Sequence, residues 1–359
     1  MSSRATRYDA ARQNPTHTNH AAAAGAALLA GASARLAITL LVALGTLAAG
    51  APARAWPGTV AHVEGRARNP NPFPRPASLE GAVQFWRSIF TRYESHQTVL
   101  HDRKNMNVIW EVIPLPTDAD GNVLEQQARA RVRARTKALR QRLRQLAAAG
   151  TPQTPEDKIL FSLVGYDADR IAGAAKRVRA QRGVADHFRK GLQRARNWLG
   201  KIYTILDAEG VPREIVALPF VESMFNPDAR SSAGAAGLWQ LMPGTAGDYG
   251  LRVNRRQDER LVVPKATRAA ARLLRDNYEM LGTWPLAITG YNHGPYGVRR
   301  AVNELGSREL AYLIEHYKKS TWGFASKNFY AEFLAVLDIL RELDPTEAAI
   351  AFESQSAAR

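Results

Sequence analysis

The second half of the chain most restricts the folds open to this protein, because it contains helical patterns and no recognisable strand. After the break at Gly210-Val-Pro212, helical stretches of roughly 10–20 residues are joined by short loops. The stretches Lys265 to Leu281 and Ser326 to Glu342 are examples, since each repeats apolar residues at helical spacing. No segment there alternates apolar and polar residues as a half-buried strand does. The sequence therefore predicts an all-α fold.

The first half is also predicted to be mainly helical. Residues 81–115 indicate a helix followed by a short extended stretch at Asn107 to Ile113, and Thr117 to Asn122 is typical of a turn. Two further helices are predicted from Asp167 to Arg182 and from Asp186 to Ala208. No repeated unit is visible along the chain.

A strongly basic helix is predicted from Leu124 to Ala149, where leucines recur at helical spacing. Such a run is usually a solvated helix face, but it can also hold an anionic polymer. Nucleic-acid binding is a third interpretation, and the absence of a base-stacking motif argues against it. The helix carries eight cations and no acid between Arg129 and Arg144: Arg129, Arg131, Arg133, Arg135, Lys137, Arg140, Arg142 and Arg144.

Composition narrows the chemistry. The 359 residues carry a net charge of +16, from 49 basic and 33 acidic residues, which favours an anionic partner. The chain has no cysteine, so disulfide scaffolds, thiolate catalysis and cysteine-ligated metals are excluded. The histidines show no metal-ligand spacing, so we expect no metal and no cofactor.

The N-terminus resembles an export signal. The apolar run Leu36 to Leu47 follows Arg35 and precedes small residues and Ala53-Arg54-Ala55, the pattern of a cleavable signal peptide. An uncleaved interfacial anchor is the alternative. We therefore expect a periplasmic or cell-envelope protein, and not a lipoprotein, because acylation needs a cysteine.

The segment from residue 217 to residue 250 carries the chemistry. Glu222 follows the apolar Leu218-Pro-Phe-Val221, and apolar neighbours raise the pKa of a carboxyl, as a general acid requires. A helix-terminal glutamate with no catalytic role is the alternative. The small residues from Ser231 to Gly237 would let backbone approach a ligand closely, and Gln240 offers an amide to a sugar. Trp239 is interpreted as a core residue.

Taken together, these motifs resemble the transglycosylase SLT domain, the lysozyme-like domain of lytic murein transglycosylases. The likeness is greatest to the membrane-bound lytic murein transglycosylase D group, and it covers about residues 205–310. Lys327-Asn328-Phe329-Tyr330 is similar to the closing helix of that group. The resemblance rests on Glu222-Ser223, Asn226-Pro227, Ser231, Gly234-Ala235, Gly237-Leu-Trp-Gln240, Met242-Pro-Gly-Thr-Ala246, Tyr291-Asn292 and Gly294-Pro295.

Three features depart from that group. It often has C-terminal LysM wall-binding repeats and a lipobox cysteine, and neither is found here. Tyr291-Asn292 is usually followed by alanine, whereas this chain has His293. A single histidine is more often structural than catalytic, but it could alter substrate fit or pH response.

The resemblance implies cleavage of the β-1,4 bond between N-acetylmuramic acid and N-acetylglucosamine in peptidoglycan, with a 1,6-anhydro product. It implies that Glu222 is the general acid and then the base. A goose-type lysozyme-like hydrolase and a non-catalytic peptidoglycan-binding protein are the alternatives. The residues implied to bind the substrate are Ser223, Ser231, Gln240, Met242, Tyr291 and Asn292.

The expected organisation follows from these assignments. We expect peptidoglycan strands as the partner and no nucleic acid, with peripheral association to cell wall or membrane through the Arg129–Arg144 helix. The sequence does not indicate an oligomeric state. The predicted parts are a signal peptide (1–55), a Pro-rich linker (56–80), a helical N-terminal region containing the arginine-rich helix (81–200), a lysozyme-like catalytic domain (201–345) and a frayed tail (346–359).

Overall fold

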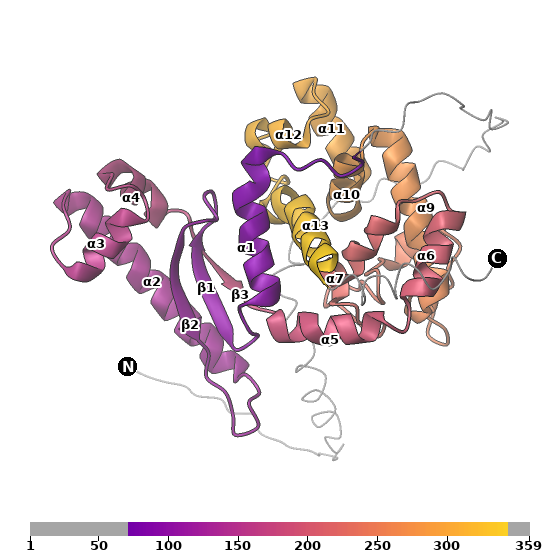
Figure 1. Cartoon of the computed structure of the whole chain (residues 1–359), viewed down its shortest axis with the longest axis horizontal. Coiled ribbons are helices and arrows are strands. Elements are labelled where there is room, and N and C mark those ends of the chain that lie inside the picture. Colours follow the sequence, from indigo (N-terminus) through magenta and orange to yellow (C-terminus); the bar gives the residue numbers. More distant parts are fainter. Residues whose placement is uncertain (1–70, 344–359) are drawn as a thin grey trace, which may run out of the picture.

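The computed structural model describes residues 71–343, so the predicted signal peptide and tail lie outside the described residues. Within this range the chain forms a large helical body and a smaller unit of three strands and three helices, which lie side by side (Figure 1). No helix in this part of the chain has the length and apolar character needed to cross a membrane. The predicted linker is described from Asn71, and there Phe73 is buried in the core of the body.

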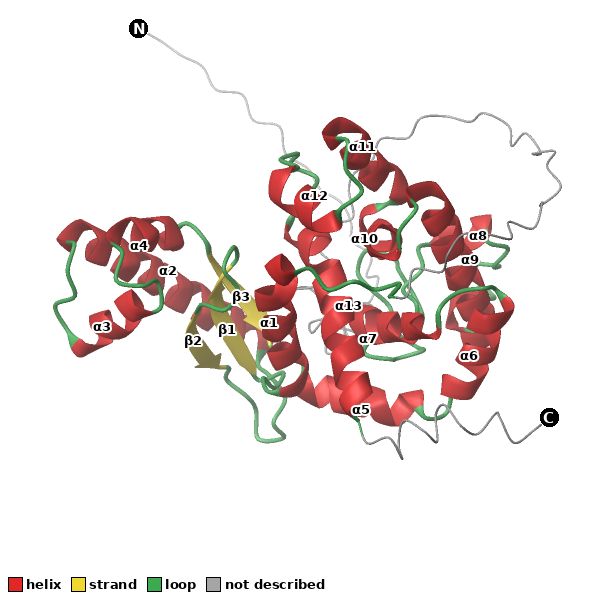
Figure 2. Ribbon diagram, turned by 45° about the horizontal axis from the view of Figure 1, so that its top comes forward, coloured by secondary structure: helices red, strands yellow, loops and turns green. Residues whose placement is uncertain are grey.

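The smaller unit is built on an antiparallel sheet with strand order β2-β1-β3 (Figure 2). Val99 and Leu100 are neighbours on β1 and point to opposite faces, because side chains alternate along a strand. Val99 packs into the core of the helical body and Leu100 into the core of the smaller unit. The sheet therefore lies between the two cores. Its strands are β1 (Gln97–Asp102), β2 (Ile109–Pro114) and β3 (Val178–Arg182).

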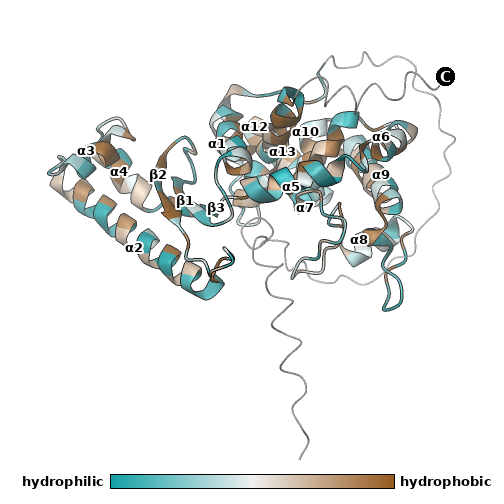
Figure 3. Ribbon diagram, turned by 60° about the horizontal axis from the view of Figure 1, so that its bottom comes forward, coloured by the Kyte–Doolittle hydropathy of each residue, from teal (hydrophilic) through white to brown (hydrophobic). Residues whose placement is uncertain are grey.

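Helices cover the outer face of this sheet. The longest contributes mainly Ala128, Leu143 and Leu146 to the core, and most of its other residues are hydrophilic (Figure 3). It ends at Gly150, whose φ of 72° suits a left-handed cap. The three helices of this unit are α2 (Glu125–Ala149), α3 (Pro155–Ser162) and α4 (Ala168–Ala175).

The helical body contains the first and the last helix of the described chain side by side, α1 (Glu80–Thr91) and α13 (Phe324–Glu342). Arg75 and Arg87 make ion pairs with Asp338 and Glu342 of α13. The two ends of the described chain therefore close one core. The helices between them are α5 (Ala185–Ala195), α6 (Leu199–Ala208), α7 (Leu218–Ser223), α8 (Pro243–Asp248), α9 (Val263–Leu281), α10 (Trp284–His293), α11 (Pro295–Leu305) and α12 (Leu310–His316). Short 3₁₀ turns lie at Ala77–Leu79, Arg213–Ala217 and Glu259–Leu261.

The predicted all-α class is confirmed as a mostly helical fold, with a small three-stranded sheet that the prediction did not include. The basic helix and the helices ending at Leu281 and Glu342 lie where the sequence placed them. The prediction of one helix from Asp167 to Arg182 is wrong over its last five residues, because β3 pairs with β1 there. The predicted helix from Asp186 to Ala208 is interrupted between α5 and α6.

Candidate active site

Glu222 lies near the end of the short helix α7, whose first four residues are buried. The chain leaves this helix through Met224 and Phe225, which have φ values of 51° and 56°. Two consecutive non-glycine residues in the left-handed region cost free energy, so neighbouring structure must hold them. The helix before Glu222 is thus fixed by burial, and the turn after it by outside contacts.

Those contacts come from α5. The Arg194 guanidinium donates hydrogen bonds to the carbonyl oxygens of Phe225 and Met224. Gly191 lies one turn earlier, and a Cβ atom there would come 2.6 Å from the Met224 oxygen. The absence of a side chain at Gly191 therefore lets α5 approach the strained turn.

Ser223 fastens the same turn to the following loop. Its hydroxyl donates to the Leu238 carbonyl at 2.8 Å, with the Pro219 carbonyl at 3.1 Å. It also accepts the backbone N–H of Asn226 at 3.1 Å. Ser223 is buried, and these backbone groups use its hydrogen-bonding capacity. The geometry gives Ser223 a supporting role and does not favour the predicted contact with substrate.

The loop from residue 231 to residue 241 is held by a buried arginine that sequence reasoning missed. Arg260 donates to the carbonyls of Gly234 at 2.7 Å and Leu241 at 2.9 Å. Its other nitrogens bind both carboxylate oxygens of Asp258, at 2.8 and 2.9 Å. Gly237 has φ +80°, and a Cβ there would come 1.9 Å from the Arg260 carbonyl oxygen. This position accepts no residue larger than glycine.

Trp239, Gln240 and Tyr291 meet at this loop. Trp239 is fully buried and donates from Nε1 to Thr267 at 2.9 Å, which agrees with the interpretation of Trp239 as a core residue. The Tyr291 hydroxyl donates to the Trp239 carbonyl at 2.7 Å. The Gln240 amide nitrogen donates to the carbonyls of Gly237 and Ala229, at 2.8 and 3.2 Å. The tyrosine from α10 is thereby fixed beside the segment that follows Glu222.

The Glu222 side chain is half-buried, so it combines apolar surroundings with contact to solvent. Burial, together with the charge of the nearby Glu332 carboxyl, raises its pKa from an ordinary 4.5 to about 8. No described residue contributes a hydrogen bond that would stabilise the ionised form. The charge of Glu222 in turn helps burial to raise the pKa of Tyr291 well above its ordinary value. Glu222 is therefore protonated at neutral pH.

Glu332 is a second acid in this region that sequence reasoning missed. It lies on α13 and is 3% exposed, and its Oε2 has no hydrogen-bond partner among the described residues. Burial raises its pKa to about 8, and the charge of Arg179 on β3 opposes that rise. A single glutamate within an apolar helix carries no motif, so only the folded chain shows that Glu332 lies near Glu222.

The remaining predicted residues lie on elements around this centre. Ser231 accepts the Ala235 N–H at 2.9 Å. Met242 is half-buried at the start of α8, and the half-buried Asn292 near the end of α10 has a side chain without a hydrogen-bond partner among the described residues. His293 contacts the Ser326 hydroxyl at 2.8 Å and packs edge-on against Trp322. None of these four makes a recorded contact with Glu222.

The described residues contain no group of three side chains suited to holding a metal ion. The geometry at Glu222 consists of a neutral carboxyl, a fixed tyrosine and a rigid loop of small residues. Such a site can donate a proton to a substrate atom and take one back.

Comparison with known proteins places this centre in a known domain. Residues 204–314 match the model of the Transglycosylase SLT domain, and this range includes every predicted site residue. The resemblance inferred from the sequence is therefore confirmed for this region. Arg194 and Glu332 lie outside the matched range.

Two kinds of curated relatives match over about a third of the chain. Membrane-bound lytic murein transglycosylase D of Escherichia coli (strain K12) is 35% identical over 134 residues, which cover 36% of this chain and 28% of that protein. A putative tributyltin chloride resistance protein of Alteromonas sp. (strain M-1) is 33% identical over 123 residues, covering 34% of this chain and 59% of that protein. The matched region thus spans less than two thirds of either relative.

Among solved structures, the lytic transglycosylase Slt from Pseudomonas aeruginosa is similar, with 21% sequence identity and a TM-score of 0.32. The alignment covers 62% of this chain and 38% of that one.

Proposed function

We propose that this protein is a peptidoglycan lytic transglycosylase with Glu222 as its single catalytic acid and base. The observation that carries the proposal is the half-buried Glu222, whose carboxyl has a pKa raised to about 8. It lies inside the region that matches the Transglycosylase SLT domain. A carboxyl that holds its proton at neutral pH can protonate a leaving group, which an ordinary glutamate cannot do efficiently.

The reaction needs no second carboxylate. Glu222 protonates the glycosidic oxygen as its bond to C1 of N-acetylmuramic acid breaks. The ionised Glu222 then takes the proton of the C6 hydroxyl as that oxygen bonds to C1. The proton lost in the first step is restored in the second, and the product carries a 1,6-anhydro end without consuming water. In this scheme Gln240, Tyr291 and Asn292 line the substrate cleft together with Ser231 and Met242.

A hydrolase of the same bond is the second candidate, because Glu332 provides another carboxyl near Glu222. An inverting hydrolase needs that second group ionised to activate water, and a retaining one needs it as a nucleophile. Glu332 is 3% exposed and its pKa is raised to about 8, so it is neutral and shielded from substrate at pH 7. Asp258 is ionised but is engaged by Arg260 and Arg230. Both observations favour the anhydro reaction.

We further propose that the protein acts in the cell envelope and that the basic α2 helps it associate with anionic wall or membrane components. The proposal rests on the predicted export signal and on the charge of α2. It also fits the relatives that are named membrane-bound murein enzymes.

The deciding experiment is mass spectrometry of the muropeptides released when the purified protein is incubated with sacculi. We expect anhydro-muropeptides from the wild type and a loss of about 1000-fold in Glu222→Gln. Asp228→Asn is the matched control, because Asp228 is an exposed acid six residues further on and should leave the rate unchanged. Reducing-end products would establish the hydrolase instead. Equal release by wild type and Glu222→Gln would exclude Glu222 as the acid.

A further inference from the structure

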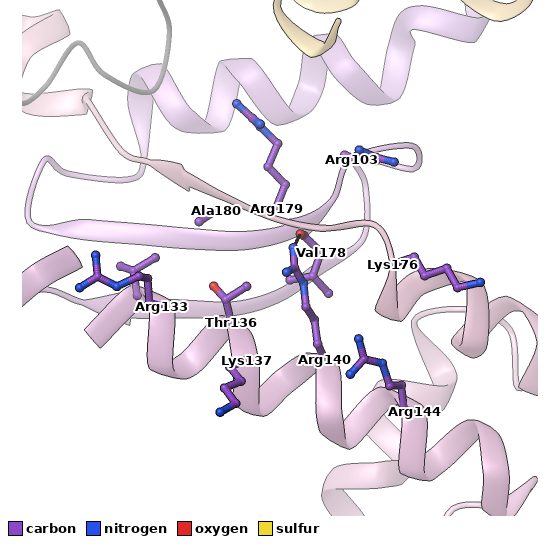
Figure 4. A pocket seen from close by; sticks show the side chains of 11 residues that line it. Arg103, Arg133, Thr136, Lys137, Arg140, Arg144, Lys176, Val178, Arg179 and Ala180 are labelled. Atoms are coloured by element: carbon purple, nitrogen blue, oxygen red, sulfur yellow. Dashed lines mark hydrogen bonds between the residues drawn. The ribbon is translucent and has the colours of Figure 1, made fainter. Parts of the chain in front are cut away.

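A cationic pocket of about 600 Å³ lies between α2 and β3, in the smaller unit (Figure 4). None of the proposed catalytic or substrate-binding residues lines it. Its lining contains no acidic residue, and its few other members are small or apolar, such as Thr136, Val132 and Ala180. The cations that line it are Arg103, Arg133, Lys137, Arg140, Arg144, Lys176 and Arg179.

The α2 residues of the pocket form one stripe along the helix. Arg133, Lys137, Arg140 and Arg144 follow one another at intervals of three or four residues, which places them on one face. Like charges at these intervals repel one another. The stripe is therefore unfavourable unless an anion lies against it.

Two of the four α2 cations outside the pocket have acidic partners. Arg135 pairs with Glu111 at 2.7 Å and Arg142 with Asp157 at 2.5 Å. By contrast, no pocket cation forms an ion pair with an acid among the described residues. Arg129 and Arg131 lie outside the pocket without an ion pair among the described residues, so charge on α2 is neutralised at two positions outside the pocket and at none inside it.

Arg140 lies at the centre of this arrangement. One of its terminal nitrogens donates to the Val178 carbonyl of β3 at 2.8 Å, which points the guanidinium from α2 toward the strand (Figure 4). Its Nε is buried and has no hydrogen-bond partner among the described residues. Arg179, in contrast, extends from the other side of β3 over the Phe324 ring. Buried Nε donors without a partner among the described residues thus occur in both Arg140 and Arg179, and of these two guanidiniums the one of Arg140 lies between α2 and β3.

We infer that this pocket binds a ligand carrying two or more phosphate groups. Guanidinium groups match phosphate oxygens with paired hydrogen bonds, and most of the lining cations are arginines. Phosphates supply more charge per volume than isolated carboxylates, as so many cations in one pocket require. No aromatic side chain lines the pocket to stack on a base, which disfavours a nucleic acid. The site goes beyond the proposed function and would stand if the chain cleaved no glycan.

The test measures binding of inorganic tripolyphosphate by calorimetry at constant ionic strength, with citrate as a tricarboxylate of comparable charge. We expect one saturable site that prefers tripolyphosphate. Arg140→Gln combined with Arg144→Gln should weaken binding at least about tenfold. Arg129→Gln combined with Arg131→Gln removes the same charge from exposed positions of α2 outside the pocket. This control should change the affinity for tripolyphosphate less than about twofold.

If the Arg140 variant fails to fold, Arg133→Gln with Lys137→Gln replaces two exposed pocket residues instead. If the pocket and control variants weaken tripolyphosphate binding equally, binding depends on diffuse charge and not on the pocket, and the proposal is overturned. Equal affinity for citrate, or tighter pocket-dependent binding of a single-stranded oligonucleotide, would also overturn it. Vesicles containing cardiolipin, whose headgroup carries two phosphates, and vesicles of phosphatidylcholine then distinguish the two sources. Pocket-dependent binding to the anionic vesicles indicates a lipid headgroup, and binding of tripolyphosphate alone indicates a soluble oligophosphate.

Discussion

The helical body and the smaller unit both bury charged groups without a full set of partners, but they do so with opposite signs. In the body the groups are the carboxyls of Glu222 and Glu332. In the smaller unit they include the guanidiniums of Arg140 and Arg179. A carboxyl in apolar surroundings becomes neutral by keeping its proton, and the raised pKa values of both glutamates show this response.

A guanidinium has no such response, because it stays protonated at any pH that a folded protein survives. It needs an acceptor from the protein or from a ligand. Arg260 in the body has four acceptor contacts, whereas among the described residues Arg140 has only the Val178 carbonyl. An incompletely paired acid can therefore serve proton transfer, whereas an incompletely paired arginine can serve an anionic ligand.

The largest effect on stability is expected from replacing one of these two arginines, Arg260, by methionine. Arg260→Met removes a buried cation and leaves Asp258 and two carbonyls without it, so the free energy of unfolding should fall by about 3 kcal/mol or more. Arg140→Met loses one hydrogen bond and should cost about 1 kcal/mol or less in the absence of ligand. Urea denaturation of the two variants measures both values. Similar losses would contradict the distinction between an internally satisfied and a ligand-directed arginine.

The pH dependence of glycan cleavage should follow the carboxyls. In the proposed reaction Glu222 acts first as an acid, so kcat/KM should fall above about pH 8, by about tenfold per further pH unit. Glu332→Gln removes a neighbouring acid and should move this alkaline limb to lower pH. Glu342→Gln changes an exposed acid of the same helix and should leave the limb in place. An unshifted limb in Glu332→Gln would show that Glu332 does not act on Glu222.

Stability should depend on the same two acids. Their pKa values are about 8 in the folded state and near 4.5 in the unfolded chain, so between these values the unfolded chain releases protons that the folded protein retains. Wild-type stability should therefore fall as pH rises from 4.5 to 8. The double variant Glu222→Gln with Glu332→Gln should lose less stability over this pH window. Its Tm should exceed that of the wild type by about 5 °C at pH 8 and should be similar at pH 4. Parallel melting curves at both pH values would contradict this.

The smallest effect is expected at His293. Burial and the charge of Arg300 lower its pKa, so the ring is neutral at neutral pH. His293→Ala removes the contacts with Ser326 and Trp322 and should cost about 1–2 kcal/mol in unfolding free energy. The pH profile of cleavage between pH 7 and 9 should keep its shape. A changed profile would give this histidine a role in the reaction.

Sequence reasoning identified the features that local pattern encodes. Glu222 could be found because an apolar helix and a small-residue loop flank it, and the basic helix because its leucines recur at helical spacing. Strand β3 could not be predicted, since Val178–Arg182 has helix-compatible residues and becomes a strand only by pairing with β1. Glu332 and Arg260 were missed for a related reason. Arg260 pairs with the nearby Asp258, but it also holds the carbonyls of Gly234 and Leu241, which are distant in the sequence. Glu332 is likewise far in sequence from Glu222, and neither Arg260 nor Glu332 belongs to a local motif.

The close packing of α1 and α13 has a practical consequence for dissecting this protein. The region that matches the Transglycosylase SLT domain ends at residue 314, before α13, and starts after Arg194. A fragment cut to those limits would lack the side chain that holds the turn after Glu222. It would also expose the apolar surfaces that α1 and α13 cover. The recognisable domain and the cooperative folding unit are therefore different lengths of chain, and loss of activity on trimming would report misfolding rather than a missing catalytic group.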